Sequence, residues 1–146
     1  RGDRAFDYYS RIAPTFQDHV ALRKIEPYVY AQMVAGKQAA VPGEAKNSWL
    51  TGTAAWNFHA IAEHILGIKP TYDGLQIDPC IPADWPEYRV TRRFRGANYH
   101  VQIRNPDGVC KGVTSILVDG EEVNGNVIPL AEPGSACQVE VVLGEA

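Results

Sequence analysis

The sequence predicts an α+β protein with helices in its first half and antiparallel strands in its second. Apolar residues recur at helical spacing up to about Gly67, whereas after Pro70 they alternate with polar ones. Glycine, proline, asparagine and aspartate interrupt the second half at short intervals, which is typical of strands joined by tight turns. We therefore expect two domains, residues 1–70 and residues 71–146.

The first helix is expected just after the start of the chain. Asp3 is a suitable N-cap for a segment carrying Ala5, Phe6 and Ile12, and Pro14 should end it. The chain opens on Arg1 rather than methionine, in what reads as the entry to this helix, so we expect further sequence upstream.

Two more helical segments are predicted before Pro70. The stretch from His19 to Met33 reads as a short helix or turn around Pro27, followed by an inward-facing segment from Tyr28 to Met33. The third helix has the clearest pattern and runs from about Gly52 to Leu66, with Gly67 as its C-terminal cap.

The second half should form an antiparallel β-sandwich or jelly-roll unit. Alternating apolar residues predict four strands, and Asn105–Gly108 and Asp119–Gly120 carry strong turn signals. The expected strands are Tyr88–Phe94, Tyr99–Ile103, Val113–Val118 and Val139–Leu143. On the first of these, Arg92 and Phe94 should share one face, with Arg93 and Arg95 on the other.

Composition excludes several functional classes. The 146 residues are 45% hydrophobic and 21% charged with a net charge of -3, as in an ordinary folded domain. Nucleic acid is not expected as a partner, because binding a phosphate backbone requires a basic field. No apolar run approaches the roughly 20 residues that span a bilayer, so no membrane segment is expected. Three widely spaced cysteines favour a reducing compartment, and we expect a cytoplasmic protein.

A small-residue turn beside the third helix is the best candidate for a functional site. Thr51-Gly52-Thr53 opens directly into that helix. The first amides of a helix lack intrahelical acceptors and carry a partial positive charge, so an oxyanion is favoured there. Gly52 would allow close approach to the backbone, and Thr51 adds a hydroxyl. The alternative interpretation is that Thr51 is simply an N-cap.

Two tryptophans and one glutamine near this turn also fit a sugar site. Aromatic faces stack on sugars through the same burial that suits them to a core. Trp56, within the helix, is expected in the core, whereas Trp49 in the turn is the better candidate for lining a pocket. The amide of Gln32 has groups that can both donate to and accept from sugar hydroxyls.

No metal site or nucleophile is predicted. His59 and His64 are five residues apart, which turns them about 140° from each other on a helix. The chain also has no CxxC, P-loop or Gly-x-Ser-x-Gly motif.

Long ordered segments of the chain resemble one enzyme family. They begin with Glu26-Pro27-Tyr28-Val29-Tyr30-Ala31-Gln32 and with the whole run Gly43–Asn57, which includes Trp49-Leu50-Thr51-Gly52-Thr53-Ala54-Ala55-Trp56. They continue through Ile65–Pro70, Tyr72–Leu75, Asp78–Pro82 and Phe94-Arg95-Gly96. These segments resemble the inverting β-disaccharide phosphorylases, including cellobiose and chitobiose phosphorylases.

The resemblance implies a fold and a set of site residues. It implies that residues 1–70 are the last helices of an (α/α)6 barrel and residues 71–146 an appended jelly-roll-type β-sandwich. It also implies that Thr51 and Gly52 bind phosphate and that Gln32 contacts sugar. The general acid is then an aspartate on an upstream segment, so no catalytic residue is expected in this chain, and the chain alone should be inactive. A homodimer is also implied.

The implied reaction is reversible phosphorolysis of a β-linked disaccharide, cellobiose or N,N'-diacetylchitobiose, to an α-sugar 1-phosphate with inversion. Phosphate is a substrate, and no cofactor is expected. Phosphate would replace both the water and the general base of an inverting glycosidase. A different hypothesis is a non-catalytic carbohydrate-binding or interaction module that uses exposed aromatics such as Tyr88 or Tyr99.

Overall fold

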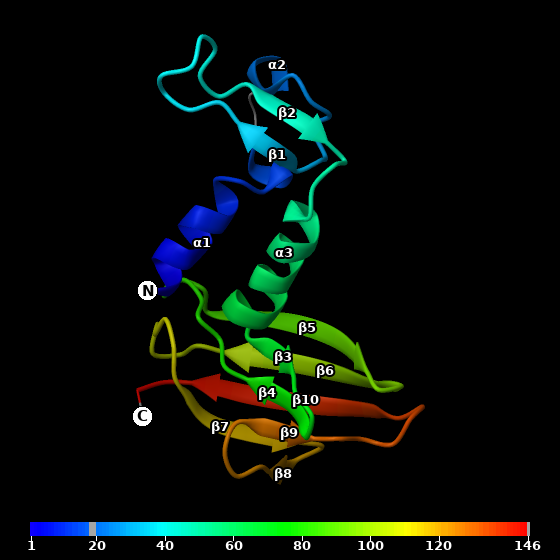
Figure 1. Cartoon of the computed structure of the whole chain (residues 1–146). Coiled ribbons are helices and arrows are strands. Elements are labelled where there is room, and N and C mark those ends of the chain that lie inside the picture. The colour runs from blue at the N-terminus through cyan, green and yellow to red at the C-terminus, as the bar shows by residue number, and fades with distance from the viewer. Residues whose placement is uncertain (18–19, 146) are drawn as a thin grey trace. The chain divides into compact units, whose positions relative to one another are not determined.

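The computed structural model describes residues 1–17 and 20–145, which form two compact units (Figure 1). The larger unit comprises Arg1–Phe6 with Ile61–Ala146, and the smaller comprises Asp7–Ala60. Helices and strands are both present, so the α+β class predicted from the sequence is confirmed. No helix among the described residues is long and apolar enough to cross a membrane.

The helices of the first half are shorter than their patterns predict. They are α1 (Gly2–Ser10), η1 (Pro14–Phe16, a 3-10 helix), α2 (Val20–Arg23), α3 (Thr53–His59) and η2 (Ala60–Ile65, a π-helix). The expected helix from Gly52 to Leu66 is thus confirmed as a helical stretch, but its second half is π-helical. Gly67 follows it with φ +72°, as a C-terminal cap requires.

Two expectations for this half are wrong. Asp3 lies inside α1 instead of capping it, and its carboxylate accepts hydrogen bonds from the Ala83 amide at 3.1 Å and the Cys110 thiol at 3.3 Å. These contacts lower the pKa of the Asp3 carboxyl. Tyr28 and Met33 are exposed rather than inward-facing, and only Val29 of that segment is buried. The expected start of this segment at His19 lies outside the described residues.

The smaller unit also contains a strand pair that the sequence analysis did not predict. β1 (Ala31–Val34) runs antiparallel to β2 (Ala45–Ser48), with Ala31 opposite Ser48 and Met33 opposite Lys46. Few side chains of this unit are buried in the described structure. Those that are include Ala13, Arg23, Val29, Ala45 and Asn57.

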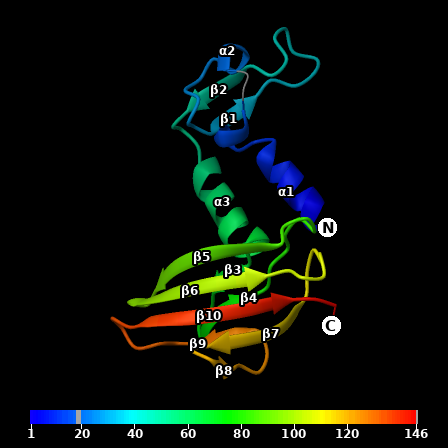
Figure 2. The same cartoon turned by 180° about the vertical axis from the view of Figure 1, so that it is seen from behind.

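The larger unit is built from two sheets. One has the strand order β5-β6-β10-β7-β8 and the other β3-β4-β9. The bounds are β3 (Ile68–Pro70), β4 (Gly74–Ile77), β5 (Glu87–Phe94), β6 (Ala97–Arg104), β7 (Val113–Val118), β8 (Glu121–Glu122), β9 (Val127–Pro129) and β10 (Ala136–Leu143). The small sheet lies against one face of the large one (Figures 1 and 2).

Alternation along the strands creates the core of this unit. Successive residues of β6 and β10 are buried and exposed in turn, which places one side of each strand against the small sheet. The fully buried side chains come from both sheets and include Leu75, Ile77, Tyr99, Val101, Ile103, Ile116, Ile128, Val139, Val141 and Leu143. The predicted faces of β5 are confirmed for Arg92 and Phe94, on the half-buried side, and for Arg93, on the exposed side. Arg95 lies past the end of the strand, in the turn to β6.

Two hairpins of the large sheet close through tight turns, of which the sequence predicted the one at Asp119-Gly120. Arg95-Gly96 joins β5 to β6 and Asp119-Gly120 joins β7 to β8, and all four residues have positive φ. A two-residue loop with two positive φ values is the type I′ turn whose twist suits a hairpin. At the Asn105–Gly108 turn, the buried Asn105 amide bonds the Val109 backbone at both its N–H and its C=O.

Two further expectations for the β half are wrong. β10 pairs parallel with β6 while pairing antiparallel with β7, so the large sheet is not wholly antiparallel. This happens because β7, β8 and β9 separate β6 from β10 in the chain, and β10 enters between β6 and β7. Tyr99 is only 1% exposed, and Tyr88 is half-buried with its hydroxyl on the Leu66 carbonyl, so neither is the exposed aromatic of the binding-module hypothesis.

Candidate functional site

The strand pair β1–β2 places Gln32 beside Asn47. The register sets these two residues opposite each other, and the Asn47 Nδ2 donates to the Gln32 Oε1 at 2.8 Å. Both side chains are exposed. With its carbonyl oxygen engaged by Asn47, the Gln32 amide keeps its NH2 group for another partner.

The backbone takes an unusual path from the end of β2 to the Thr51 turn. Asn47 and Trp49 have φ values of 56° and 68°, in the left-handed region that residues other than glycine seldom adopt. Trp49 is held there by its indole N–H, which donates to the Glu26 carboxylate at 3.0 Å. The Glu26 backbone amide, Ser48 and Trp49 all hydrogen-bond this carboxylate and lower its pKa. Backbone strain of this kind tends to concentrate at functional sites.

Thr51 and Thr53 form a compact hydroxyl pair at the start of α3. The Thr51 Oγ1 lies 2.5 Å from the Thr53 Oγ1 and accepts the Thr53 backbone N–H at 3.0 Å. The Thr53 Oγ1 also lies 3.4 Å from the Ala31 carbonyl oxygen of β1. The N-cap position belongs to Gly52. Thr51 therefore supports the first helical amide without being the N-cap residue itself.

The fold of the described residues does not require a glycine at position 52. Its φ of -77° is open to any residue, and a Cβ added there would meet only the Trp56 ring at 3.6 Å, an ordinary contact. At Gly67 and Gly74, by contrast, an added Cβ would lie 2.3 Å and 1.8 Å from backbone atoms. The bare backbone at Gly52 is therefore free to admit a ligand closely.

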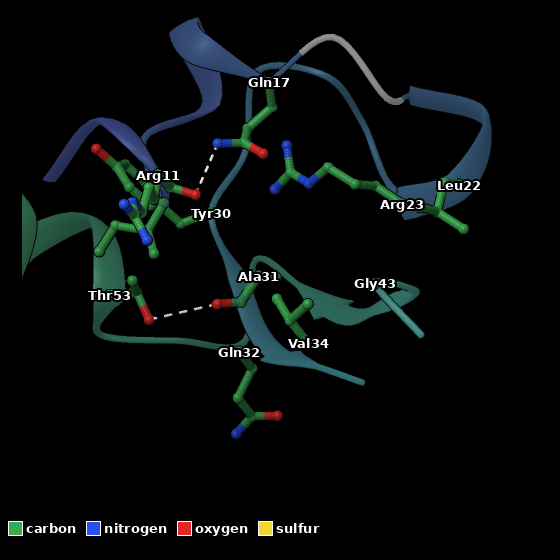
Figure 3. Close-up of a pocket in the computed structure, with 11 residues that line it drawn as sticks. Arg11, Gln17, Leu22, Arg23, Tyr30, Ala31, Gln32, Val34, Gly43 and Thr53 are labelled. Carbon is green, nitrogen blue, oxygen red and sulfur yellow. Dashed lines mark hydrogen bonds between the residues drawn. The ribbon is translucent and has the colours of Figure 1, made fainter. Parts of the chain in front are cut away.

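A pocket of about 360 Å³ opens beside these residues, within the size range of small-molecule sites (Figure 3). Its lining includes Gln32 and Thr53, whereas Thr51 and Gly52 are not part of it. Arg23 also lines it, although this side chain is only 8% exposed and donates to the Val29 carbonyl at 3.3 Å. In Figure 3 the Gln32 side chain points away from Arg23, and the Thr53 hydroxyl points to Ala31.

Tyr30 adds a neutral phenol to this pocket. Burial, together with a hydrogen bond to Tyr9, raises the pKa of Tyr30 to about 12. At neutral pH the phenol therefore stays protonated and can serve as a hydrogen-bond donor.

The two tryptophans differ from their predicted roles. Trp56 is 72% exposed, so its assignment to the core is wrong for the described structure, and its ring contacts His59 edge-on. Trp49 is 68% exposed and packs edge-on against Tyr28. It does not line the pocket.

Sequence reasoning missed Asn47 and Arg23. Asn47 reaches Gln32 only because of the β1–β2 register, and the two residues are fifteen positions apart. Lys46, Asn47 and Ser48 are all polar, so this segment lacks the alternation of apolar and polar residues that would predict strand β2. Arg23 showed no signal, because burial of a charged residue depends on its tertiary surroundings.

Two protein-family models match consecutive parts of this chain. Residues 1–67 match the catalytic domain of the Glycosyl hydrolase 94 superfamily, and residues 68–124 match the C-terminal domain of Glycosyl hydrolase family 65. The first part of the chain is therefore similar to a segment of a Glycosyl hydrolase 94 catalytic domain, and the part after residue 67 to a C-terminal domain. The predicted boundary at residue 70 stays a prediction.

Individual relatives narrow the class. The N,N'-diacetylchitobiose phosphorylases of Vibrio proteolyticus and Vibrio furnissii are each 46% identical over 99% of this chain. A solabiose phosphorylase of Paenibacillus borealis is 39% identical over 97% of it. The chain spans only 18% of the length of each of these relatives. It belongs to the disaccharide phosphorylase family of the Glycosyl hydrolase 94 superfamily.

Proposed function

We propose that this chain is part of a glycoside phosphorylase that reversibly converts a β-linked disaccharide and inorganic phosphate into an α-sugar 1-phosphate and a free sugar, with inversion. The Thr51-Gly52 turn is the observation that carries this proposal. It combines a hydroxyl with a glycine that the fold does not require. The 46% identity with two N,N'-diacetylchitobiose phosphorylases supports the same conclusion.

In this proposal Thr51 and Gly52 bind the attacking phosphate. An inverting glycosidase needs one acid for the leaving oxygen and one base for water, and phosphate replaces both water and base because it is already a nucleophile. The protein must then hold the anion opposite the acid. A hydroxyl donor and an accessible backbone suit this task, and fixed donors also stabilise charge in the transition state.

Gln32 contacts a sugar in this proposal. Its carbonyl is occupied by Asn47, so its NH2 group faces the ligand and favours a sugar oxygen as the partner.

The general acid comes from outside this chain. The smaller unit has three carboxylates among its described residues, and each is already engaged. Asp7 pairs with Arg11, Glu44 with Lys24, and Glu26 accepts the Trp49 indole N–H. Hydrogen bonds lower the pKa of Glu26, which keeps it ionised and unable to donate a proton at neutral pH. The described carboxylates of the smaller unit thus support an acid supplied by another part of the enzyme, and in this proposal the chain alone is inactive.

The same proposal assigns the architecture and partners. The helices of the first half are the last helices of an (α/α)6 barrel, and the two sheets are an appended jelly-roll-type domain. The sparse core of the smaller unit supports this, because a barrel segment buries its apolar side chains against other helices. The enzyme works as a cytoplasmic homodimer, without a cofactor, on phosphate and a disaccharide.

Product analysis of the full-length enzyme tests the proposal. Incubation with inorganic phosphate and either N,N'-diacetylchitobiose or cellobiose is followed by NMR of the products. We expect an α-sugar 1-phosphate, with N,N'-diacetylchitobiose as the better substrate. A β-sugar 1-phosphate would refute inversion, and sugar release without added phosphate would show a hydrolase instead.

A further inference from the structure

The hydroxyl of Thr53 has two acceptors within reach but only one proton. It lies 2.5 Å from the Thr51 Oγ1 and 3.4 Å from the Ala31 carbonyl oxygen. Hydrogen bonds between oxygens are normally about 2.5–3.0 Å long, so the contact with Thr51 is the better formed of the two.

The oxygen of Thr51 has two lone pairs to offer. One accepts the Thr53 backbone N–H at 3.0 Å. If the Thr53 hydroxyl donates to the other, both lone pairs are used, and the Thr51 proton must point to an acceptor outside the pair. In the opposite arrangement Thr51 donates to Thr53, and Thr51 has no proton left for a ligand.

A bound anion selects between these arrangements. Phosphate oxygens act mainly as acceptors, so a ligand on Thr51 requires the Thr51 hydroxyl to donate outward. We propose that Thr53 is a positioning residue for phosphate: its hydroxyl and backbone N–H together orient the Thr51 proton toward the anion. This inference rests on the proposed role of Thr51 in phosphate binding.

The arrangement also connects the turn to the sugar side of the site. When Thr53 donates to Thr51 it gives up the long contact with Ala31, the residue before Gln32 in β1. A chain of donors from Thr53 through Thr51 to the anion is cooperative, since each donation polarises the next hydroxyl.

Kinetics of the full-length enzyme with inorganic phosphate test the inference. Removing one neutral hydrogen bond in Thr53→Val should raise the phosphate KM about three- to tenfold, with a smaller change in kcat. Thr53→Ser keeps the hydroxyl and should restore the wild-type KM. Thr53→Ala is the second removal variant if valine impairs folding. Thr114→Val is the matched control, because that hydroxyl donates to the Val142 carbonyl within the larger unit.

A double variant separates positioning from direct contact. If Thr53 acts through Thr51, Thr53→Val should change the phosphate KM little in a Thr51→Ala background. Fully additive effects would overturn the inference, as would a wild-type phosphate KM in both Thr53→Val and Thr53→Ala. A wild-type KM in Thr51→Ala alone would instead overturn the proposed phosphate site.

Discussion

At the scale of single residues, two glycines differ in whether the fold requires them: the fold requires Gly67, whereas nothing in the described structure requires Gly52. Its backbone angle is ordinary and its side-chain position is open, whereas Gly67 has φ +72° and backbone atoms where a Cβ would go. Alanine at position 67 should therefore lower the stability of the protein, whereas alanine at position 52 should leave stability intact and affect phosphate binding.

Gly52→Ala should leave folding intact and impair phosphate use. We expect its unfolding free energy to change by less than about 1 kcal/mol, because alanine fits the observed backbone. The added methyl group should raise the phosphate KM roughly tenfold by blocking close approach. Gly67→Ala, the control, should lower the melting temperature instead. A wild-type phosphate KM in Gly52→Ala would contradict the assignment of this glycine.

The hydrogen bond between Glu26 and the Trp49 indole should break when the Glu26 carboxylate is protonated at low pH. The Glu26 backbone amide, Ser48 and Trp49 hold the pKa of the Glu26 carboxyl below its ordinary value of 4.5. A depressed folded pKa means that the contact stabilises the protein fully above the unfolded pKa, and that the stabilisation is lost as pH falls through the folded pKa. The NMR shift of the Trp49 indole N–H should therefore titrate below pH 4.5. In Glu26→Gln this titration should disappear; if it persists, another group is responsible.

At the scale of elements, side-chain hydrogen bonds supplement the backbone pairing at two places, in the strand pair β1–β2 and beside β6 of the large sheet. Asn47 links β2 to the Gln32 amide, and Tyr99 links β6 to the segment after β9. The first bond orients a proposed ligand contact, whereas the second adds a polar contact to the apolar core between the two sheets of the larger unit.

Asn47→Gly should weaken sugar binding without disturbing the backbone. Glycine accepts the φ of 56° at this position, so only the amide that orients Gln32 is lost. We expect a higher KM for the disaccharide and an unchanged KM for phosphate, as for Gln32→Ala. An effect of Gln32→Ala that Asn47→Gly does not share would show that Gln32 needs no orienting partner.

Tyr99→Phe should destabilise the larger unit. The Tyr99 hydroxyl accepts the Ala131 N–H at 2.8 Å and lies 3.5 Å from the Pro129 carbonyl oxygen, so its loss leaves a backbone donor unpaired. The expected cost is roughly 1 kcal/mol or more, measured by denaturant unfolding. Tyr72→Phe is the matched control, because Tyr72 is 84% exposed. Equal stability of the two variants would show that water replaces the lost bond.

At the scale of the whole molecule, local patterns predicted more than long-range ones. The helical stretch after Gly52, the strand Val113–Val118 and the Asp119-Gly120 turn follow from neighbouring residues, and the structure contains all three. The β1–β2 pair, the small sheet and the parallel β6–β10 pairing depend on contacts between distant segments. No periodicity within a single segment records these contacts.

The candidate site shows the same division. The Thr51-Gly52 turn is a candidate from its own residues, a hydroxyl and a bare backbone at a helix start, and its assignment to phosphate follows from the family resemblance. Asn47 was not predicted, since its contact with Gln32 arises from register. Trp56 was assigned to the core because apolar spacing indicates a buried face without showing what covers it.

The phosphate KM of Thr51→Ala in the full-length enzyme tests most directly whether the Thr51-Gly52 turn binds the attacking phosphate. Loss of one hydrogen bond to a charged ligand should raise the phosphate KM about tenfold to hundredfold, while the disaccharide KM changes little. Unchanged stability, measured by thermal unfolding, would exclude a folding defect as the cause. A wild-type phosphate KM in a stably folded Thr51→Ala enzyme would contradict the assignment of the turn as the phosphate site.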